Sequence, residues 1–400
     1  MLPALLLLTA SVAAVLAIWL GYPALMLMRA RRLLRDGASR ATMHRAETRD
    51  ATLSQANAAG LPASRDAWPQ VAAILATRDA APVIRARVAN LLDTDWPSHR
   101  LDIIVTLDAE GAATTPDELR GTFVDARGAP VTNVQVIVGD QPGGKACALE
   151  AAARIARGSL LLMADSRQRF ERDTLPKLAA TLADPRFGAA SGALTLGGDG
   201  NSPVHRYWAL EKRLRHAESI VHSSIGVTGA VYAVRRALWP GLPAGTILDD
   251  VYVPMALVLA GHRVGFVPDA IATDVRDFDA SAEQGRKART LTGVLQLCRL
   301  LPDVLSPTRN PVWGQFVAHK LLRLLTPLFV LTGALSALAL LLLLLQTWPR
   351  PTLAALSAAL LTVAAVPPLR RLATTALRWG IAMQVATVKG GLNGVRGRWA

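Results

Sequence analysis

Cysteine is almost absent from this sequence of 400 residues, and charged and aromatic side chains are scarce. The two cysteines, Cys147 and Cys298, form no CxxC motif, and the histidines lack a metal-ligand spacing such as HExxH. This composition predicts neither a disulfide framework nor a structural zinc site. Charged residues make up only 18% of the chain and apolar residues 51%. So high an apolar fraction indicates a membrane protein.

Three long runs contain no charged residue at all: residues 5–28, 324–348 and 351–369. About 20 apolar residues are enough to cross the hydrocarbon core of a bilayer. Four arginines follow the first run, between Arg29 and Arg35, where a cleaved secretory signal would have its basic residues in front. We therefore expect an uncleaved anchor over residues 1–28, with the N-terminus outside and the chain continuing in the cytoplasm.

The second and third runs predict a transmembrane hairpin over residues 324–369, with Arg350 outside and Arg370 and Arg371 inside. The run from Ala337 to Leu345 contains only alanine and leucine, which argues against a core helix of a soluble protein with one polar face. The tail, residues 370–400, mixes cations with apolar side chains and is interpreted as an interfacial segment, with a further short span as the alternative.

The stretch between the anchor and the hairpin is predicted to hold a polar linker over residues 29–67, an ordered domain over residues 68–301 and an interfacial helix over residues 302–323. The formal net charge of +14 does not indicate a nucleic-acid partner, because the arginines cluster beside the spans rather than along an aromatic-lined groove. Anionic membrane lipids and an anionic nucleotide are the partners that this charge favours.

In the ordered domain, strand and helix patterns alternate. Strands are predicted over residues 71–76, 101–107, 134–138 and 160–163, and helices over residues 82–92 and 145–157. This alternation is typical of an α/β fold with a mostly parallel sheet and helices on both faces. Ligands of such sheets bind at the carboxyl ends of the strands. The residues found there are Asp79, Asp108, the Gly143-Gly144-Lys145 turn and Asp165.

Several segments resemble the inverting membrane glycosyltransferases of family 2, relatives of cellulose and hyaluronan synthases. The resemblance covers about residues 71–300 and the flanking membrane segments. It rests on IIVTLDAEG, QPGGKACALEAA, LLLMADSRQRF, GVTGAVYAVRR, ILDDVYVPMALVLAGHRVGFVPDA and QGRKARTLTG. It implies a GT-A fold, a Rossmann-like nucleotide-diphospho-sugar transferase domain.

The resemblance implies a donor site for a nucleoside diphosphate sugar, with UDP as the expected nucleotide. Asp108 matches the aspartate that contacts the nucleobase or ribose, and Asp79 lies beside it at the end of the preceding strand. Lys145, at the start of a helix, matches the lysine that faces the diphosphate, because glycines and a helix N-terminus favour a phosphate there. The alternative for each is ordinary turn or helix-start chemistry.

Asp165 matches the first carboxylate of an Asp-x-Asp motif that holds a divalent cation, Mg²⁺ or Mn²⁺, in the family. The second position is Arg167, which does not ligate a cation and is expected to pair with phosphate directly instead. One carboxylate together with phosphate oxygens and water would make a weaker site. The metal expectation therefore rests on Asp165 alone.

The acidic pair Asp249 and Asp250 matches the family's catalytic acids, which places Asp250 as the general base that deprotonates the acceptor hydroxyl. The alternative is a pair of acids that stabilise the first turn of a helix. Thr228 and Gly229 are expected on the acceptor side, with an ordinary strand containing a glycine bulge as the alternative.

The segment QGRKARTLTG resembles the family's basic motif, in which cations stabilise the departing diphosphate. Arg289 matches its final arginine, and Arg286 and Lys287 lie in the same motif on the donor side. Thr290 stands where the family has a tryptophan, which argues against processive polymerisation. The alternative is a basic patch that contacts lipid headgroups.

These observations predict a glycosyltransferase that adds a sugar to a lipid or glycan hydroxyl at the cytoplasmic face of a bacterial inner membrane. A catalytically inactive nucleotide-sugar-binding scaffold is the main alternative, suggested by the departures at Ala80, Arg167 and Thr290. A transporter is disfavoured, because the spans lack the ionisable residues that mark a transport path.

Overall fold

The computed structural model describes residues 1–47, 61–121, 123–124, 128–197, 203–274 and 280–347, and isolated short stretches between 354 and 393. The chain forms two compact units. We call residues 26–278 and 297–315 the sheet unit, and residues 1–25, 279–296 and 316–400 the helical unit. The two units are described separately.

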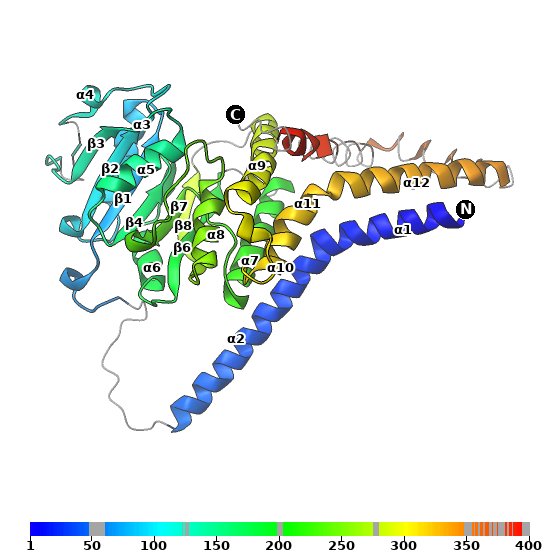
Figure 1. Ribbon diagram of the computed structural model, residues 1–400, viewed down its shortest axis with the longest axis horizontal. Coiled ribbons are helices and arrows are strands. Elements are labelled where there is room, and N and C mark those ends of the chain that lie inside the picture. Colours follow the sequence, from blue (N-terminus) through cyan, green and yellow to red (C-terminus); the bar gives the residue numbers. More distant parts are fainter. Residues whose placement is uncertain are drawn as a thin grey trace. The chain divides into compact units, whose positions relative to one another are not determined.

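The sheet unit is built on a mixed sheet of eight strands in the order β3-β2-β1-β4-β7-β6-β8-β5 (Figure 1). Its strands are β1 (Val71–Thr77), β2 (Leu101–Leu107), β3 (Val134–Val138), β4 (Leu160–Ala164), β5 (Gln168–Phe170), β6 (Phe187–Leu196), β7 (Val231–Arg235) and β8 (Arg263–Asp274). The pairs β1–β2, β1–β4, β2–β3 and β6–β8 are parallel, and β4–β7, β6–β7 and β5–β8 are antiparallel. The predicted α/β class is confirmed.

The first four strands were predicted to within one residue at each end, because each is an apolar run bounded by polar or turn residues. Strand β1 is buried along nearly its whole length. A strand buried on both faces needs helices on both faces of its sheet. Its residues Val71, Ala73 and Leu75 belong to one core cluster that includes Ile84 of α3 and residues of α6. Helix α5 packs against β1, β2 and β3.

The helices that accompany the sheet begin and end close to the predicted positions where a prediction was made. They are α3 (Ala81–Leu92), α4 (Pro116–Leu119), α5 (Lys145–Ile155), α6 (Thr174–Thr181), α7 (Pro203–Val221) and α8 (Asp249–Leu259). Helix α9 (Ala280–Leu300) follows β8 and contributes its first part to the helical unit. Side chains 280–287 of α9 lie outside the described residues.

In the helical unit, α1 (Leu2–Leu16) packs along α12 (Thr326–Thr347), as Figure 1 shows. The Trp19 indole donates a hydrogen bond of 3.2 Å to the Thr326 hydroxyl, and the guanidinium of Arg323 lies over the Trp19 ring. The stretches Leu2–Asp36 and Thr326–Gln346 are each long and apolar enough to cross a membrane. Both are mostly exposed, unlike the core helices of a soluble protein.

The helix that begins the chain extends beyond the charge-free run. A short π-helical turn (Ala17–Gly21) leads into α2 (Tyr22–Glu47), which therefore includes the first part of the predicted linker. Residues 29–35 are arginine, leucine and alanine, which are strong helix formers. A prediction from hydropathy ends the helix at the first charged residue and so misses this extension. The rest of that linker, up to residue 60, lies outside the described residues.

The segment predicted as one interfacial helix over residues 302–323 forms short pieces instead. They are a 3₁₀ turn (Pro302–Leu305), α10 (Trp313–Phe316), a π-helical turn (Val317–Leu321) and α11 (Leu322–Leu324). Pro307 and Pro311 interrupt the helix, because proline removes a backbone donor. The second arm of the predicted hairpin and the C-terminal tail lie mostly outside the described residues.

Candidate functional site

Polar side chains from separate parts of the sheet unit meet at the carboxyl ends of β1, β2 and β4. Because these strands are parallel neighbours, Asp79, Asp108 and Asp165 follow strands that end at one edge of the sheet. Strand β7 runs antiparallel to β4, with Val231 opposite Ala164, so Gly229, just before β7, reaches the same edge. The sheet topology thus gathers residues that are far apart in the sequence.

Asp108 organises the loop that precedes α5. One of its carboxylate oxygens accepts hydrogen bonds from the backbone N–H of Gly144 (2.9 Å) and of Glu110 (3.0 Å), and the other accepts from Arg78 Nε (2.7 Å). Burial opposes ionisation of Asp108, but these donors outweigh it and hold its pKa below the ordinary value. Gly143 and Gly144 both have positive φ, which the turn into α5 requires.

Lys145, the first residue of α5, lies between two carboxylates. Its ammonium is 3.2 Å from Asp165 Oδ1 and 3.2 Å from Asp249 Oδ2. Burial alone would lower the pKa of Lys145, but the charges of Asp165 and Asp249 dominate and raise it above its ordinary value. The lysine is therefore a fixed positive charge at the start of a helix.

Asp249 and Asp250 open α8 and differ in exposure. Asp249 is buried against Lys145, whereas Asp250 is half-buried. The backbone carbonyl of Asp250 accepts a hydrogen bond of 2.8 Å from Val227 N–H, which holds the segment before β7 beside it. A methyl group added at Gly229 would lie 3.4 Å from Asp250 Cβ and 3.6 Å from Lys145 Nζ. Gly229, the Asp250 side chain and the Lys145 ammonium thus lie close together.

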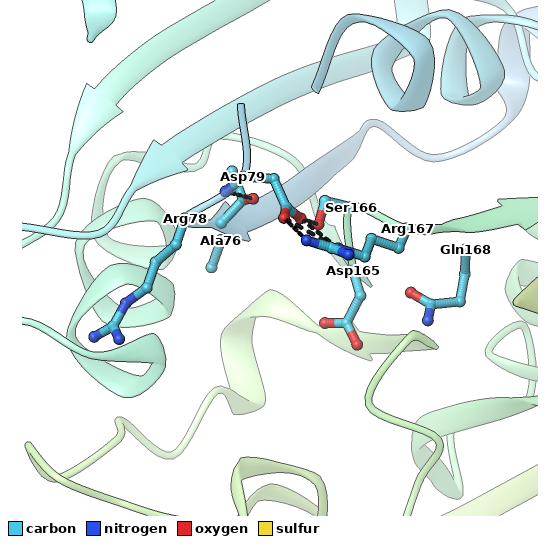
Figure 2. Close-up of a pocket in the computed structure, with 8 residues that line it drawn as sticks. Ala76, Arg78, Asp79, Asp165, Ser166, Arg167 and Gln168 are labelled. Atoms are coloured by element: carbon cyan, nitrogen blue, oxygen red, sulfur yellow. Dashed lines mark hydrogen bonds and ion pairs between the residues drawn. The ribbon is translucent and has the colours of Figure 1, made fainter. Parts of the chain in front are cut away.

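Arg167 pairs with Asp79. Its Nε donates hydrogen bonds of 3.0 and 3.2 Å to the two carboxylate oxygens of Asp79, Nη2 forms a further contact, and the Ser166 hydroxyl also donates to this carboxylate. Arg167 is the main cause that holds the pKa of Asp79 below its ordinary value. Figure 2 shows Ser166 and Arg167 pointing toward Asp79, with the Asp165 carboxylate directed away from this group.

A pocket of about 230 Å³ lies over this edge of the sheet. It is lined by Ala76, Thr77, Arg78, Asp79, Asp165, Ser166, Arg167 and Gln168 (Figure 2). Two guanidinium groups, each held by an aspartate, stand at its wall. Such a wall suits a polar, anionic ligand.

The residues of this edge do not fit a divalent cation. Asp165 offers one carboxylate, already in contact with the Lys145 ammonium, and the guanidinium of Arg167 is turned toward Asp79. No group of three or more His, Cys, Asp or Glu side chains in the described part of the chain is arranged to hold a metal ion. Hard cations prefer several oxygen ligands. The positive charge at this edge comes instead from side chains.

Most of the predicted site residues come together here, and the others differ in position or role. Gly229 lies beside Asp250, but the Thr228 hydroxyl donates to the Gly192 carbonyl (2.8 Å) and stabilises the adjoining strand. Arg289 is an exposed residue of α9 in the helical unit. The side chains of Arg286 and Lys287 lie outside the described residues.

Three further residues of this edge carried no prediction. Arg78 and Ser166 pair with Asp108 and Asp79, and both are adjacent in sequence to predicted residues, a signal that was available. Tyr232 is fully buried, and within the described residues its hydroxyl has no hydrogen-bond partner. Burial, and then the charge of Asp249, raise its pKa well above the ordinary value. In the sequence, candidate residues were sought after the carboxyl end of each strand. Tyr232 lies near the start of β7, which runs antiparallel to β4, and so it was not considered.

Comparison with known proteins gives matches to the whole sheet region. Residues 69–296 match the family model described as "Glycosyltransferase like family 2". A protein of Rhizobium sp. (strain N33) named N-acetylglucosaminyltransferase is 26% identical over 314 residues, which cover 73% of this chain and 66% of that protein. A Sinorhizobium fredii protein of the same name is 31% identical over 218 residues, covering 49% and 51%. The chain spans between about half and two thirds of the length of these relatives.

Among solved structures, a mannosyltransferase from Pyrobaculum calidifontis in complex with GDP-Man and Mn²⁺ superposes with a TM-score of 0.66. It is 22% identical to this chain, and the match covers 97% of this chain and 99% of the other. At this level of identity the likeness establishes the fold. In that enzyme the fold is combined with a divalent cation.

Proposed function

Since this chain belongs to glycosyltransferase family 2 and has the GT-A fold, we propose that it transfers a sugar from a nucleoside diphosphate sugar to a hydroxyl of a lipid or glycan, with inversion at the sugar. Several relatives are named N-acetylglucosaminyltransferase, which makes UDP-N-acetylglucosamine the proposed donor. The observation that carries the proposal is that the half-buried Asp250 side chain lies beside Gly229 and the ammonium of Lys145.

The donor would bind in the pocket at the ends of β1 and β4. Its diphosphate would face the cations Arg78, Lys145 and Arg167, and Asp108 would hold the glycine turn that leads into α5. Backbone N–H groups at a helix start and nearby guanidinium groups are the donors that bind phosphate in proteins. This arrangement supports a diphosphate-linked ligand.

In the transfer step, Asp250 would take the proton of the acceptor hydroxyl as its oxygen attacks the anomeric carbon. The bond from that carbon to the diphosphate breaks, and the nucleoside diphosphate leaves with the bonding pair. Inversion requires the base on the face opposite the leaving group, close to the nucleophile. Asp249, buried against Lys145, would position the lysine.

The site of action would be the cytoplasmic face of a bacterial inner membrane. The hydropathy of Leu2–Asp36 and Thr326–Gln346 supports a membrane location, and the arginines after the first run support a cytoplasmic sheet unit. In a variant without Cys147 and Cys298, a cysteine placed at exposed Arg120 should react with a membrane-impermeant maleimide only after the cells are permeabilised. Labelling in intact cells would contradict this orientation.

The test of the function uses the full chain in detergent or nanodiscs, with UDP-N-acetylglucosamine, GDP-mannose and extracted bacterial membrane lipids. We expect release of a nucleoside diphosphate together with sugar incorporation, and a loss of about 10²- to 10⁴-fold in Asp250→Asn with UDP binding retained. Asp269→Asn, which removes an exposed carboxylate from β8, serves as the matched control. If cells that carry only the Asp250→Asn variant keep the function of the protein, the catalytically inactive scaffold would be favoured instead.

A further inference from the structure

Arg167 makes the edge of the sheet at the proposed donor pocket more positive than the Asp-x-Asp pattern would. In the Asp-x-Asp pattern that this segment resembles, the second position is a carboxylate, whereas here it is a guanidinium. One negative charge is replaced by one positive charge, and the difference equals the charge of a single Mg²⁺ or Mn²⁺ ion. The sequence itself therefore supplies the charge that a divalent cation would bring.

Arg167 is held where such a charge is useful. Two hydrogen bonds from its Nε to Asp79, of 3.0 and 3.2 Å, orient the guanidinium at the wall of the 230 Å³ pocket. The side chain remains about half exposed, so a ligand in the pocket can reach it. A planar guanidinium fixed on one side by a carboxylate is well suited to meet phosphate oxygens on another.

Lys145 places a second positive charge where the carboxylates would otherwise hold a metal ion. Its ammonium contacts both Asp165 and Asp249 at 3.2 Å. A divalent cation bound to Asp165 would have to displace this ammonium or lie close to it, and like charges at such distances repel strongly in a partly buried site. The two carboxylates closest to the lysine are thus already neutralised in part.

We propose that this glycosyltransferase binds the diphosphate of its donor without a divalent cation, with Arg167 and Lys145 in the place of the metal ion. The inference rests on the proposed function, since it concerns the same donor site. Asp79 would act as a positioning residue for Arg167, and Asp165 and Asp249 as positioning residues for Lys145.

The test measures binding of UDP to the full-length protein by calorimetry, in EDTA and in Mn²⁺. For the unmodified protein we expect the same dissociation constant in both, to within about twofold. Arg167→Asp places a carboxylate near Asp79 and Asp165, so we expect UDP binding in EDTA to fall about tenfold or more and to recover with Mn²⁺. Electron paramagnetic resonance should then detect bound Mn²⁺ in this variant and not in the unmodified protein.

Arg213→Asp makes the same change of charge at an exposed position of α7 and should behave like the unmodified protein. If the unmodified protein binds UDP only with Mn²⁺, the inference about the cation is wrong while the proposed function stands. If the protein binds neither UDP nor GDP under either condition, the proposed function is wrong and the inference with it. The measurement on the unmodified protein decides the matter even if Arg167→Asp does not fold.

Discussion

The ammonium of Lys145 and the buried carboxylate of Asp249 lie 3.2 Å apart, although 104 positions separate the two residues in the sequence. The contact joins the first residue of α5 to the first residue of α8. It connects the donor-side turn to the helix that carries the proposed base. The pair therefore contributes both to stability and to the geometry of the site.

Removing the lysine should expose this dual role. Lys145→Met leaves Asp249 buried without its cation, and we expect the free energy of unfolding to fall by about 1–3 kcal/mol and UDP binding to weaken. Asp249→Asn should be milder, and the double variant should be less destabilised than the sum of the single ones. Thermal unfolding in detergent measures these differences. Strict additivity would show that the two residues do not interact.

Asp108 should give the stability a defined dependence on pH. Its pKa in the folded protein lies below the ordinary value of 3.8, so the unfolded chain binds this proton more tightly. The stabilisation is therefore fully present above the unfolded value and is lost as the pH falls through the lower, folded value. At pH 7 we expect the free energy of unfolding of Asp108→Asn to be lower by about 1–2 kcal/mol, seen as a lower Tm. This difference from the unmodified protein should narrow only in strong acid. A gap that narrows between pH 7 and pH 5 would contradict this account.

Gly229 lies so close to Asp250 that a single added methyl group should affect the proposed base. Gly229→Ala has room at 3.4 Å from Asp250 Cβ and 3.6 Å from Lys145 Nζ, so folding should be retained. The added methyl narrows the place proposed for the acceptor hydroxyl, and we expect kcat/KM to fall about tenfold, since reacting groups tolerate little displacement. Gly314→Ala is the matched control, because nothing lies within 4 Å of its added methyl group. Equal values of kcat/KM for the two variants would show that Gly229 does not border the acceptor hydroxyl.

How far the sequence predicts this molecule can be seen strand by strand. Strands β1 to β4 were predictable because each is a short apolar run bounded by polar or turn residues, and parallel neighbours place their ends together. Strand β7 follows the same edge in the opposite direction, so the position of Tyr232 depends on pairing that no local pattern encodes. The direction of pairing is a property of the whole sheet.

For the site, the sequence predicts which residues are present but not which partners their side chains contact. Asp108, Lys145 and Asp250 were predictable from their motifs, whereas the pairing of Arg167 with Asp79 was not predicted, because the sequence suggested phosphate as the partner of this arginine. A long arginine side chain has many rotamers, and its partner is chosen by the contacts that surround it. The pair joins residues 88 positions apart, at the ends of two strands whose adjacency only the fold defines.

The buried hydroxyl of Tyr232 is expected to contribute to function while it lowers stability. Its hydroxyl is buried without a hydrogen-bond partner among the described residues, and such a group costs about 1–3 kcal/mol. Tyr232→Phe should therefore raise the free energy of unfolding by about 1 kcal/mol, seen as a higher Tm. Because the hydroxyl lies near Asp249 and Lys145, we expect sugar transfer to slow at the same time, a trade typical of active sites. A variant that is less stable and equally active would mean that the hydroxyl serves the fold alone.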